Sequence, residues 1–567
     1  MKSKFLSALT VFVVMVAVVG VIAAIAIPSL LRARASYSPQ RHTPMDAYRS
    51  TPPATSRALP AHEEAAAGVP RATADTLAKL AAGEWRDQPS MNTEAYSRIR
   101  DNAFLAVASN PLSTFSIDVD TASYANVRRF LNAGQLPPAD AVRIEELINY
   151  FRFDYPSPEG TAPFSVAASV AACPWKPAHK LVHIGLQARR VDEQAVPPRN
   201  LVFLLDVSGS MNEPAKLPLL KDSMRLLVDQ LNERDRVAIV VYAGAAGLVL
   251  APTPGDRKGE IRAALDALQA GGSTAGGAGI QLAYKVAEDT FVDGGVNRVI
   301  LATDGDFNVG VTSAGGLERL IEEKRRSGVF LSVLGFGAGN LEDSTMEMLA
   351  DKGNGNYAYI DTLAEGRKVL VTEAGSTLVT VAKDVKIQVE FNPRTVAAFR
   401  LIGYENRVLA HEDFNDDVKD AGDIGAGHSV TALYEIVPAG VALDTGSVDA
   451  LKYQQPRTPA AFAGSGELAT VKLRYKAPDG ETSALLSAAV RDEGGEASAN
   501  LRFAAAVAEF GMLLRDSEHK GTASFAHALE LGRGAAGKDA EGFRAEFVGL
   551  VELAQRLAET KGGLVGS

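Results

Sequence analysis

Between residues 200 and 378 the chain alternates short apolar runs, several of them rich in β-branched residues, with segments whose apolar residues recur at helical spacing. The strand-like runs are residues 200–205, 236–243, 298–303, 330–336 and 356–360. The helix-like segments are residues 216–231, 256–268, 276–291, 317–326 and 362–378. Strands that alternate with helices predict a Rossmann-like α/β fold, in which a mostly parallel sheet carries helices on both faces.

Oxygen-bearing side chains follow the first of these strands on one tight turn. Asp206, Ser208 and Ser210 alternate along the segment Asp-Val-Ser-Gly-Ser, so one carboxylate and two hydroxyls can converge on a hard divalent cation. Thr274 precedes a helical segment and Asp304 follows another strand. Both therefore lie at the edge of an open α/β sheet where ligands gather. Taken alone, the D-x-S-x-S spacing also fits ordinary turn and helix-capping residues.

Together these segments resemble a von Willebrand factor A domain with an intact metal-ion-dependent adhesion site. The resemblance implies five metal ligands: Asp206, Ser208, Ser210, Thr274 and Asp304. Oxygen-only ligands with two carboxylates suit Mg²⁺, with Mn²⁺ or Ca²⁺ as alternatives. In the family an acidic side chain of a protein partner completes the coordination. The motifs supply no general base for hydrolysis, so we expect adhesion or protein binding and no catalytic residues.

The composition argues against other classes of function. The chain has 58 Lys and Arg against 68 Asp and Glu, a net charge of −10, and no long basic stripe, which disfavours nucleic acid as a partner. It lacks a G-x-x-x-x-G-K-[ST] loop, which argues against a nucleotide. The single Cys173 excludes an intrachain disulfide framework. We interpret Asp118 and Asp120 as structural polar groups and do not expect His179 and His183 to share a metal.

The N-terminal segment predicts a membrane anchor. Residues 5–31 carry no charge and are long enough to span a bilayer, whereas the apolar core of a secretory signal is shorter. Residues 1–35 are therefore expected to form a transmembrane anchor, or a signal if the chain is cleaved at the site of small residues at 33–35. Lys2 and Lys4 favour a cytoplasmic N-terminus, which places the globular part in the periplasm. If the segment is cleaved, the protein is secreted.

Part of this anchor resembles the N-terminal helix of type IV pilins. The resemblance covers residues 20–34, from the glycine that precedes the Ile-Ala-Ala-Ile run to the arginines after Pro28. Aligned on Pro28, Leu6 and Val11 stand where pilins have the glycine before their cleavage point and the helix glutamate. We therefore expect a membrane anchor with a pilin-like sequence, and not a pilin.

Five regions follow from these patterns. They are the anchor or signal (1–35), a disordered Pro/Ala-rich tether (36–90), a flank of helices and β strands (91–195), the von Willebrand A domain (196–378) and a β-rich region ending in helices (379–567). Residues 110–124 and 144–151 resemble the N-terminal flank of bacterial von Willebrand A proteins with a dedicated C-terminal region. We predict that both flanks join in one sandwich-like β domain, with the α/β domain inserted in it or flanked by it.

Two classes of function remain open. In the first, the protein is tethered to the membrane and binds a protein partner through the cation. In the second, it is an envelope enzyme, or an assembly or processing factor, that uses the von Willebrand A domain for recognition. No Ser/His/Asp or Cys/His constellation stands out in the flanks, which favours the non-enzymatic class.

Overall fold

The computed structural model describes most of the chain beyond the predicted tether. The described residues are 94–191, 196–272, 276–305, 314–374, 379–417, 419, 421–442, 466–478 and 480–565. The predicted anchor, the predicted tether and Thr274 lie outside these residues. Among the residues that are described, no helix is long and apolar enough to cross a membrane.

The α/β part is built on a six-stranded sheet in the order β10-β9-β8-β5-β6-β7. Its strands are β5 (Arg199–Asp206), β6 (Arg236–Tyr242), β7 (Ala246–Pro254), β8 (Val296–Thr303), β9 (Phe330–Phe336) and β10 (Tyr357–Ile360). Neighbours pair in parallel except β7, which pairs antiparallel with β6 at the edge. The central strand β5 is buried along its whole length, as expected for a strand covered on both faces.

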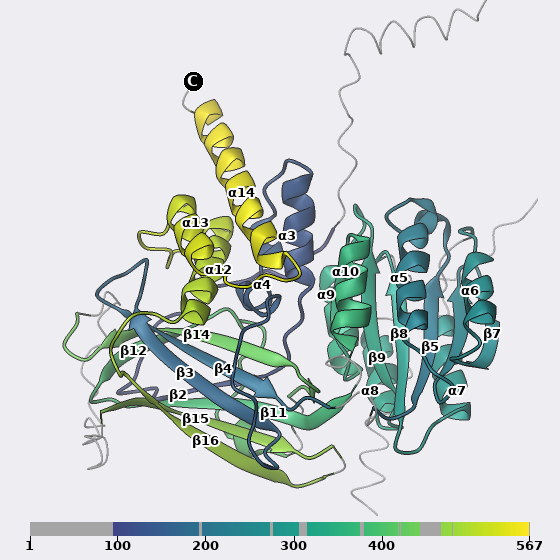
Figure 1. Ribbon diagram of the computed structural model, residues 1–567, viewed down its shortest axis with the longest axis horizontal. Helices are drawn as coiled ribbons and strands as arrows, with labels where there is room; N and C mark the ends of the chain where they lie inside the picture. Colours follow the sequence, from purple (N-terminus) through teal and green to yellow (C-terminus); the bar gives the residue numbers. More distant parts are fainter. Residues whose placement is uncertain are drawn as a thin grey trace, which may run out of the picture. The chain divides into compact units, whose positions relative to one another are not determined.

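Helices cover both faces of this sheet (Figure 1). They are α5 (Leu217–Asp229), α6 (Lys258–Asp266), α7 (Gly276–Asp289), α8 (Ala314–Arg325), α9 (Asp343–Lys352) and α10 (Leu363–Arg367). Phe203 of β5 packs in one core cluster with Leu220 of α5, whereas the next residue, Leu204, packs in another with Ile280 of α7. The predicted α/β fold with a mostly parallel sheet is confirmed.

The sequence patterns missed two elements of this part and simplified a third. Strand β7 contains Pro252 and Pro254, which are tolerated because it lies at the sheet edge. Helix α9 was also missed, although it supplies acidic residues that hold this part to its flanks. The single helix predicted at residues 362–378 is instead the short α10 followed by a π-helical turn, Lys368–Thr372. Residues 375–378 lie outside the described part.

A β sandwich forms from sequence on both sides of the α/β part. One sheet has the order β1-β12-β14-β4-β3, and the other has the order β13-β11-β15-β16 with β2 also paired to β11. The strands before the α/β part are β1 (Leu105–Ala106), β2 (Leu112–Ser116), β3 (Phe164–Ala172) and β4 (Lys180–Ala188). Those after it are β11 (Thr380–Phe391), β12 (Val396–Ile402), β13 (Ile424–Gly425), β14 (Ser429–Pro438), β15 (Glu467–Lys476) and β16 (Ser483–Arg491). Pairs β4–β14 and β2–β11 join the two flanks, so the predicted inserted arrangement is confirmed.

Helices cover the outer face of the first sheet. They are α3 (Ala122–Asn132), α4 (Ile144–Asn149), α12 (Ala499–Arg515), α13 (Phe525–Gly534) and α14 (Phe543–Val565). Leu181 of β4 packs in the cluster that contains these helices, whereas Val182 and Ile184 pack in the cluster between the two sheets. Because successive side chains of a strand face opposite sides, β4 is buried almost throughout.

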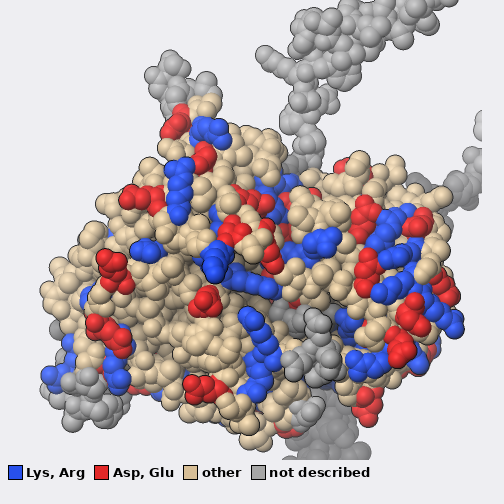
Figure 2. Space-filling view, in the orientation of Figure 1, with Lys and Arg blue, Asp and Glu red and all other residues tan. Residues whose placement is uncertain are grey.

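Charges of both signs are interleaved over α5 and α6 on the face shown in Figure 2. Arg225 of α5, for example, forms ion pairs with Asp222 and Asp266, and all three side chains are about one third to one half exposed. Exposed pairs of this kind contribute about 0–1 kcal/mol each. The ion pairs that join the α/β part to its flanks differ from these because they are buried.

Three arginines of the flanks form those buried ion pairs. Their side chains are 4%, 6% and 9% exposed for Arg128, Arg143 and Arg407, respectively. Arg128 contacts Asp361 and Glu365, Arg143 contacts Asp343, and Arg407 contacts Glu347 and Asp351. Four of these carboxylates belong to α9 or α10, and Asp361 directly follows β10. The orientation of the α/β part therefore depends on desolvated charges.

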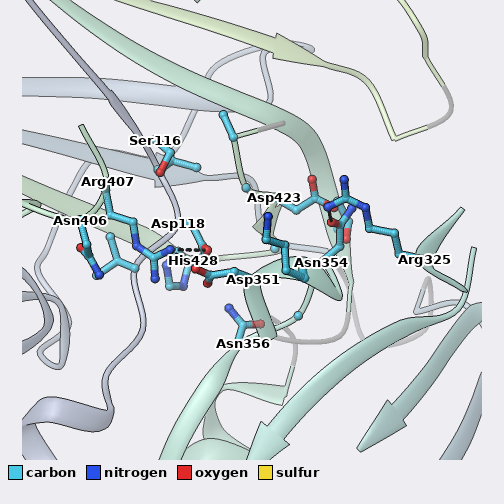
Figure 3. A pocket seen from close by; sticks show the side chains of 18 of the residues that line it. Ser116, Asp118, Arg325, Asp351, Asn354, Asn356, Asn406, Arg407, Asp423 and His428 are labelled. Carbon is cyan, nitrogen blue, oxygen red and sulfur yellow. Dashed lines mark hydrogen bonds and ion pairs between the residues drawn. The ribbon is translucent and has the colours of Figure 1, made fainter. Parts of the chain in front are cut away.

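Arg407 and two of its carboxylate partners, Asp118 and Asp351, line a cavity of about 380 Å³ (Figure 3). In this view Asp118 and Asp351 lie beside the Arg407 guanidinium. Burial raises the pKa of Asp351 to about 7, and burial together with Asp118 raises the pKa of Asp120 well above its ordinary value. Asp118 and Asp120 both lie 3.4 Å from Arg407, so their structural interpretation is supported.

Replacing Arg407 with Met should destabilise the protein strongly, because the buried carboxylates of Asp120 and Glu347 lose the guanidinium that compensates them. Breaking a buried pair by removing one partner costs roughly 3–5 kcal/mol. Urea unfolding of Arg407→Met and wild type measures the difference. The matched control is Arg225→Met in the exposed pairs, expected to cost less than about 1 kcal/mol. Equal losses for the two variants would contradict the proposed role of desolvation.

His183 of β4 is a buried neutral base between the sandwich and its helices. Its Nε2 lies 2.8 Å from the Tyr155 hydroxyl and its Nδ1 lies 3.3 Å from the Ser169 hydroxyl. Burial lowers the pKa of His183 to about 4. His179 instead contacts Glu435, 2.6 Å away, so the two histidines have separate partners.

The lowered pKa of His183 predicts a loss of stability in acid. Between pH 6.5 and 4 the unfolded chain binds a proton at this position that the folded chain does not, so the free energy of unfolding falls with falling pH. The contribution is about 3 kcal/mol across this range. Urea unfolding at several pH values should show a shallower dependence for His183→Gln. Tyr434→Phe is the control, because it removes a hydrogen bond to Ser113 rather than one to His183 and should retain the wild-type slope.

Candidate metal centre

Two parallel strands deliver carboxylates to the point where the strand order of the α/β sheet reverses. From β5 the chain passes to β6 on one side and later to β8 on the other. Asp206 is the last residue of β5, and Asp304 directly follows β8. Ligands of open α/β sheets bind at the carboxyl ends of the strands at such a switch point. Both carboxyl groups are fully buried.

The Asp206 carboxylate is fixed by hydrogen bonds on both oxygens. Oδ1 accepts the main-chain N–H of Ser208 at 2.9 Å, and Oδ2 accepts the Thr303 hydroxyl at 3.1 Å. Burial raises the pKa of Asp206 to about 6, and the neighbouring Asp304 acts in the same direction. The local environment therefore disfavours the bare negative charge and favours a compensating cation.

The two serines extend the oxygen cluster from the buried carboxylate towards solvent. Ser208 is 1% exposed, whereas Ser210 is exposed at the start of a 3₁₀ turn, Gly209–Asn212. Their hydroxyl oxygens lie 3.0 Å apart. The alternation along the D-x-S-x-S segment thus brings these hydroxyls together, as the sequence predicts.

Main-chain hydrogen bonds hold this turn against the segment that precedes Thr274. Gly271 N–H donates to the Val207 carbonyl at 2.8 Å, and Gly209 N–H donates to the Gly272 carbonyl at 3.1 Å. Gly272 has φ +90°, and an added Cβ would lie 3.2 Å from the Gly244 nitrogen. Glycine is therefore required for this close approach. Thr274 itself lies outside the described residues.

Asp304 has a basic partner that the sequence patterns did not indicate. Lys216 Nζ donates to Asp304 Oδ2 at 3.0 Å and to Asn340 Oδ1 at 3.3 Å. The lysine is 3% exposed and is the N-cap of α5. A positive charge is unfavourable at a helix N-terminus. The lysine at this position could therefore have indicated, from the sequence, that it has a negatively charged partner. Thr303, which orders Asp206, was also missed because it lies within an apolar strand.

The donor set fits a hard divalent cation. Two carboxylates can balance its charge, and hydroxyl oxygens are suitable neutral ligands. Among the described residues, no group of three or more His, Cys, Asp or Glu side chains is placed to hold a metal. A cation at Asp206 and Asp304 would therefore depend on hydroxyl groups and water for its other ligands.

Comparison with protein families gives separate matches for the α/β part and for the flank on each side of it. Residues 90–183 match the model "von Willebrand factor", residues 200–370 match "von Willebrand factor type A domain", and residues 376–557 match "Uncharacterized protein YfbK, C-terminal". The inter-alpha-trypsin inhibitor heavy chain H4 of Homo sapiens is 28% identical over 148 residues, which are 25% of this chain and 16% of that protein. A solved structure, von Willebrand factor type A from Catenulispora acidiphila, is 15% identical, covers 80% of this chain and 91% of its own, and has a TM-score of 0.37.

Similarity to one bacterial protein extends over nearly the whole chain. The protein YfbK of Escherichia coli (strain K12) is 44% identical over 493 residues, which are 86% of this chain and 85% of YfbK. This coverage includes the flanks as well as the α/β part, so it exceeds the sharing of a single domain. The chain belongs to the YfbK family of proteins with a von Willebrand factor type A domain.

Proposed function

We propose that this chain binds a protein partner through a divalent cation, with Mg²⁺ as the preferred ion. Asp206, Ser208, Ser210, Thr274 and Asp304 are the proposed ligands. A carboxylate of the partner would complete the coordination shell. The observation that carries the proposal is the convergence of two fully buried carboxylates, Asp206 and Asp304, at the switch point of the sheet.

The gradient of exposure within the site supports access by a partner. Asp206 is fully buried, Ser208 is 1% exposed, and Ser210 is exposed. A cation held between them would have its protein ligands on the buried side and a position open to solvent. A carboxylate is the natural sixth ligand, because Mg²⁺ prefers oxygen and a negative charge strengthens the contact.

Replacing Asp206 with Asn should abolish tight cation binding, because Asn keeps the size of the side chain and removes its negative charge. Isothermal titration of the full chain with Mg²⁺ measures this, and we expect more than about a hundredfold weaker affinity. Asp222→Asn, in an exposed ion pair on α5, is the matched control and should bind as the wild type does. Equal Mg²⁺ affinity for the two variants would exclude the proposed ligand set.

Partner binding is tested separately by capture from solubilised membranes in Mg²⁺ or in a chelator. The wild type should retain specific proteins in Mg²⁺ that are lost in the chelator and are lost with Asp206→Ala in either condition. An unchanged set of captured proteins would show that recognition does not use the cation. Recognition would then lie elsewhere, as expected for an envelope enzyme or assembly factor.

We further propose that residues 1–35 anchor the chain in the membrane and that residues 36–90 tether the globular part in the periplasm. The support is the uncharged run at residues 5–31, which is long enough to span a bilayer. We propose that the pilin-like sequence at residues 20–34 serves as part of this anchor.

Deleting residues 1–35 should move the protein from the membrane fraction to the soluble fraction, because the uncharged apolar run at residues 5–31 is removed. Carbonate extraction followed by immunoblotting measures the distribution. The full chain should resist extraction, and its globular part should be digested by protease added to spheroplasts. A full chain that appears wholly in the soluble fraction with a shortened N-terminus would instead show a cleaved signal.

A further inference from the structure

Lys216 places a second type of cation in the candidate metal centre. Its ammonium group lies 3.0 Å from Asp304 Oδ2, and the two side chains are 4% and 0% exposed. Asn340 Oδ1 accepts a second hydrogen bond from the same nitrogen at 3.3 Å. Lys216 thus already supplies one of the two positive charges that a divalent ion would bring to Asp206 and Asp304.

The surrounding backbone is shaped to hold this lysine. Gly337 has φ +77°, and an added Cβ there would collide with the Cγ, Cδ and Cε atoms of Lys216. A side chain at position 337 would therefore displace the lysine stem from its path to Asp304. The contact is enclosed by the fold and is not the chance meeting of two flexible surface groups.

A second carboxylate lies within reach of the ammonium group. Glu213 Oε1 is 4.0 Å from Lys216 Nζ, and the Glu213 side chain is 66% exposed. Glu213 and Lys216 lie on the connection that follows the D-x-S-x-S turn and leads into α5. When another cation occupies Asp304, the lysine has an alternative acceptor on the solvent side.

We propose that Lys216 is a resident counter-ion of Asp304 that competes with the divalent cation and thereby sets the affinity of the site. In the absence of metal, Lys216 stabilises the buried Asp304 carboxylate. A bound divalent ion must either displace this ammonium group towards Glu213 or tolerate its repulsion at close range. Lys216 is thus a positioning residue that weakens metal binding. This inference rests on the proposed ligands Asp206 and Asp304.

Lys216→Met should bind Mg²⁺ at least about tenfold more tightly than the wild type, because it keeps most of the apolar stem and removes the competing charge. Isothermal titration of the full chain measures the Kd. Lys216→Arg retains the charge and should not gain affinity. Lys221→Met on α5 is the matched control, since Lys221 donates to the main-chain carbonyls of Asp266 and Leu268.

Thermal unfolding gives a readout that does not depend on partner binding. In a chelator Lys216→Met should melt at a lower temperature than the wild type, because the buried Asp304 loses its counter-ion. Mg²⁺ should raise the melting temperature of this variant more than that of the wild type. In the chelator, the double variant Lys216→Met/Asp304→Asn should recover most of the lost stability.

The outcomes separate this inference from the proposed function. Mg²⁺ binding to the wild type with equal or weaker binding to Lys216→Met would overturn the competition while leaving the metal site intact. Failure of both proteins to bind Mg²⁺, Mn²⁺ or Ca²⁺ would overturn both proposals. Binding by Lys216→Met alone would show that the lysine closes the site to the metal.

Discussion

The pairing of β4 with β14 is the constraint on which the rest of the structure depends. It joins residues 180–187 to residues 429–436 in one antiparallel register, although some 240 residues separate the two strands in sequence. The chain must therefore leave the sandwich after β4, build the α/β part, re-enter the sandwich at β11 in the other sheet, and only then reach β14 beside β4. Closing so long a loop costs entropy, which is offset by burying both faces of β4. The start of the inserted part is fixed by β4, and its end is fixed by β11, which pairs with β2.

That double attachment explains why the charges between the parts are buried. A domain joined by one flexible linker can turn away from its neighbour, and its contacts are usually polar and wet. Here α9 and the end of β10 are held against Arg128, Arg143 and Arg407, whose side chains are less than one tenth exposed. The candidate metal centre lies at the carboxyl ends of β5 and β8. The ion pairs of α9 thus attach to the flanks the same α/β part that carries this centre.

The sequence predicted the fold best where one kind of side-chain periodicity acts over a whole element. The buried strands β5, β8 and β9 are apolar almost throughout, and the amphipathic α5 and α7 keep helical spacing. Prediction failed for β7, whose prolines are acceptable only at a sheet edge, and for α9, whose acidic residues are satisfied by distant arginines. Both depend on tertiary neighbours that local patterns do not contain.

In the candidate site, too, some residues were recognisable from local patterns and others depend on tertiary neighbours. Asp206, Ser208 and Ser210 were recognisable because one short segment holds them at alternating positions, and Asp304 because it ends a buried strand. Thr303 and Lys216 act through space, so no spacing connects them with the motif. Yet Lys216 conflicts with a local rule, since it is a lysine at a helix N-terminus. A residue that breaks a local rule in a structured chain indicates a compensating contact elsewhere, and here that contact is the buried carboxylate of Asp304.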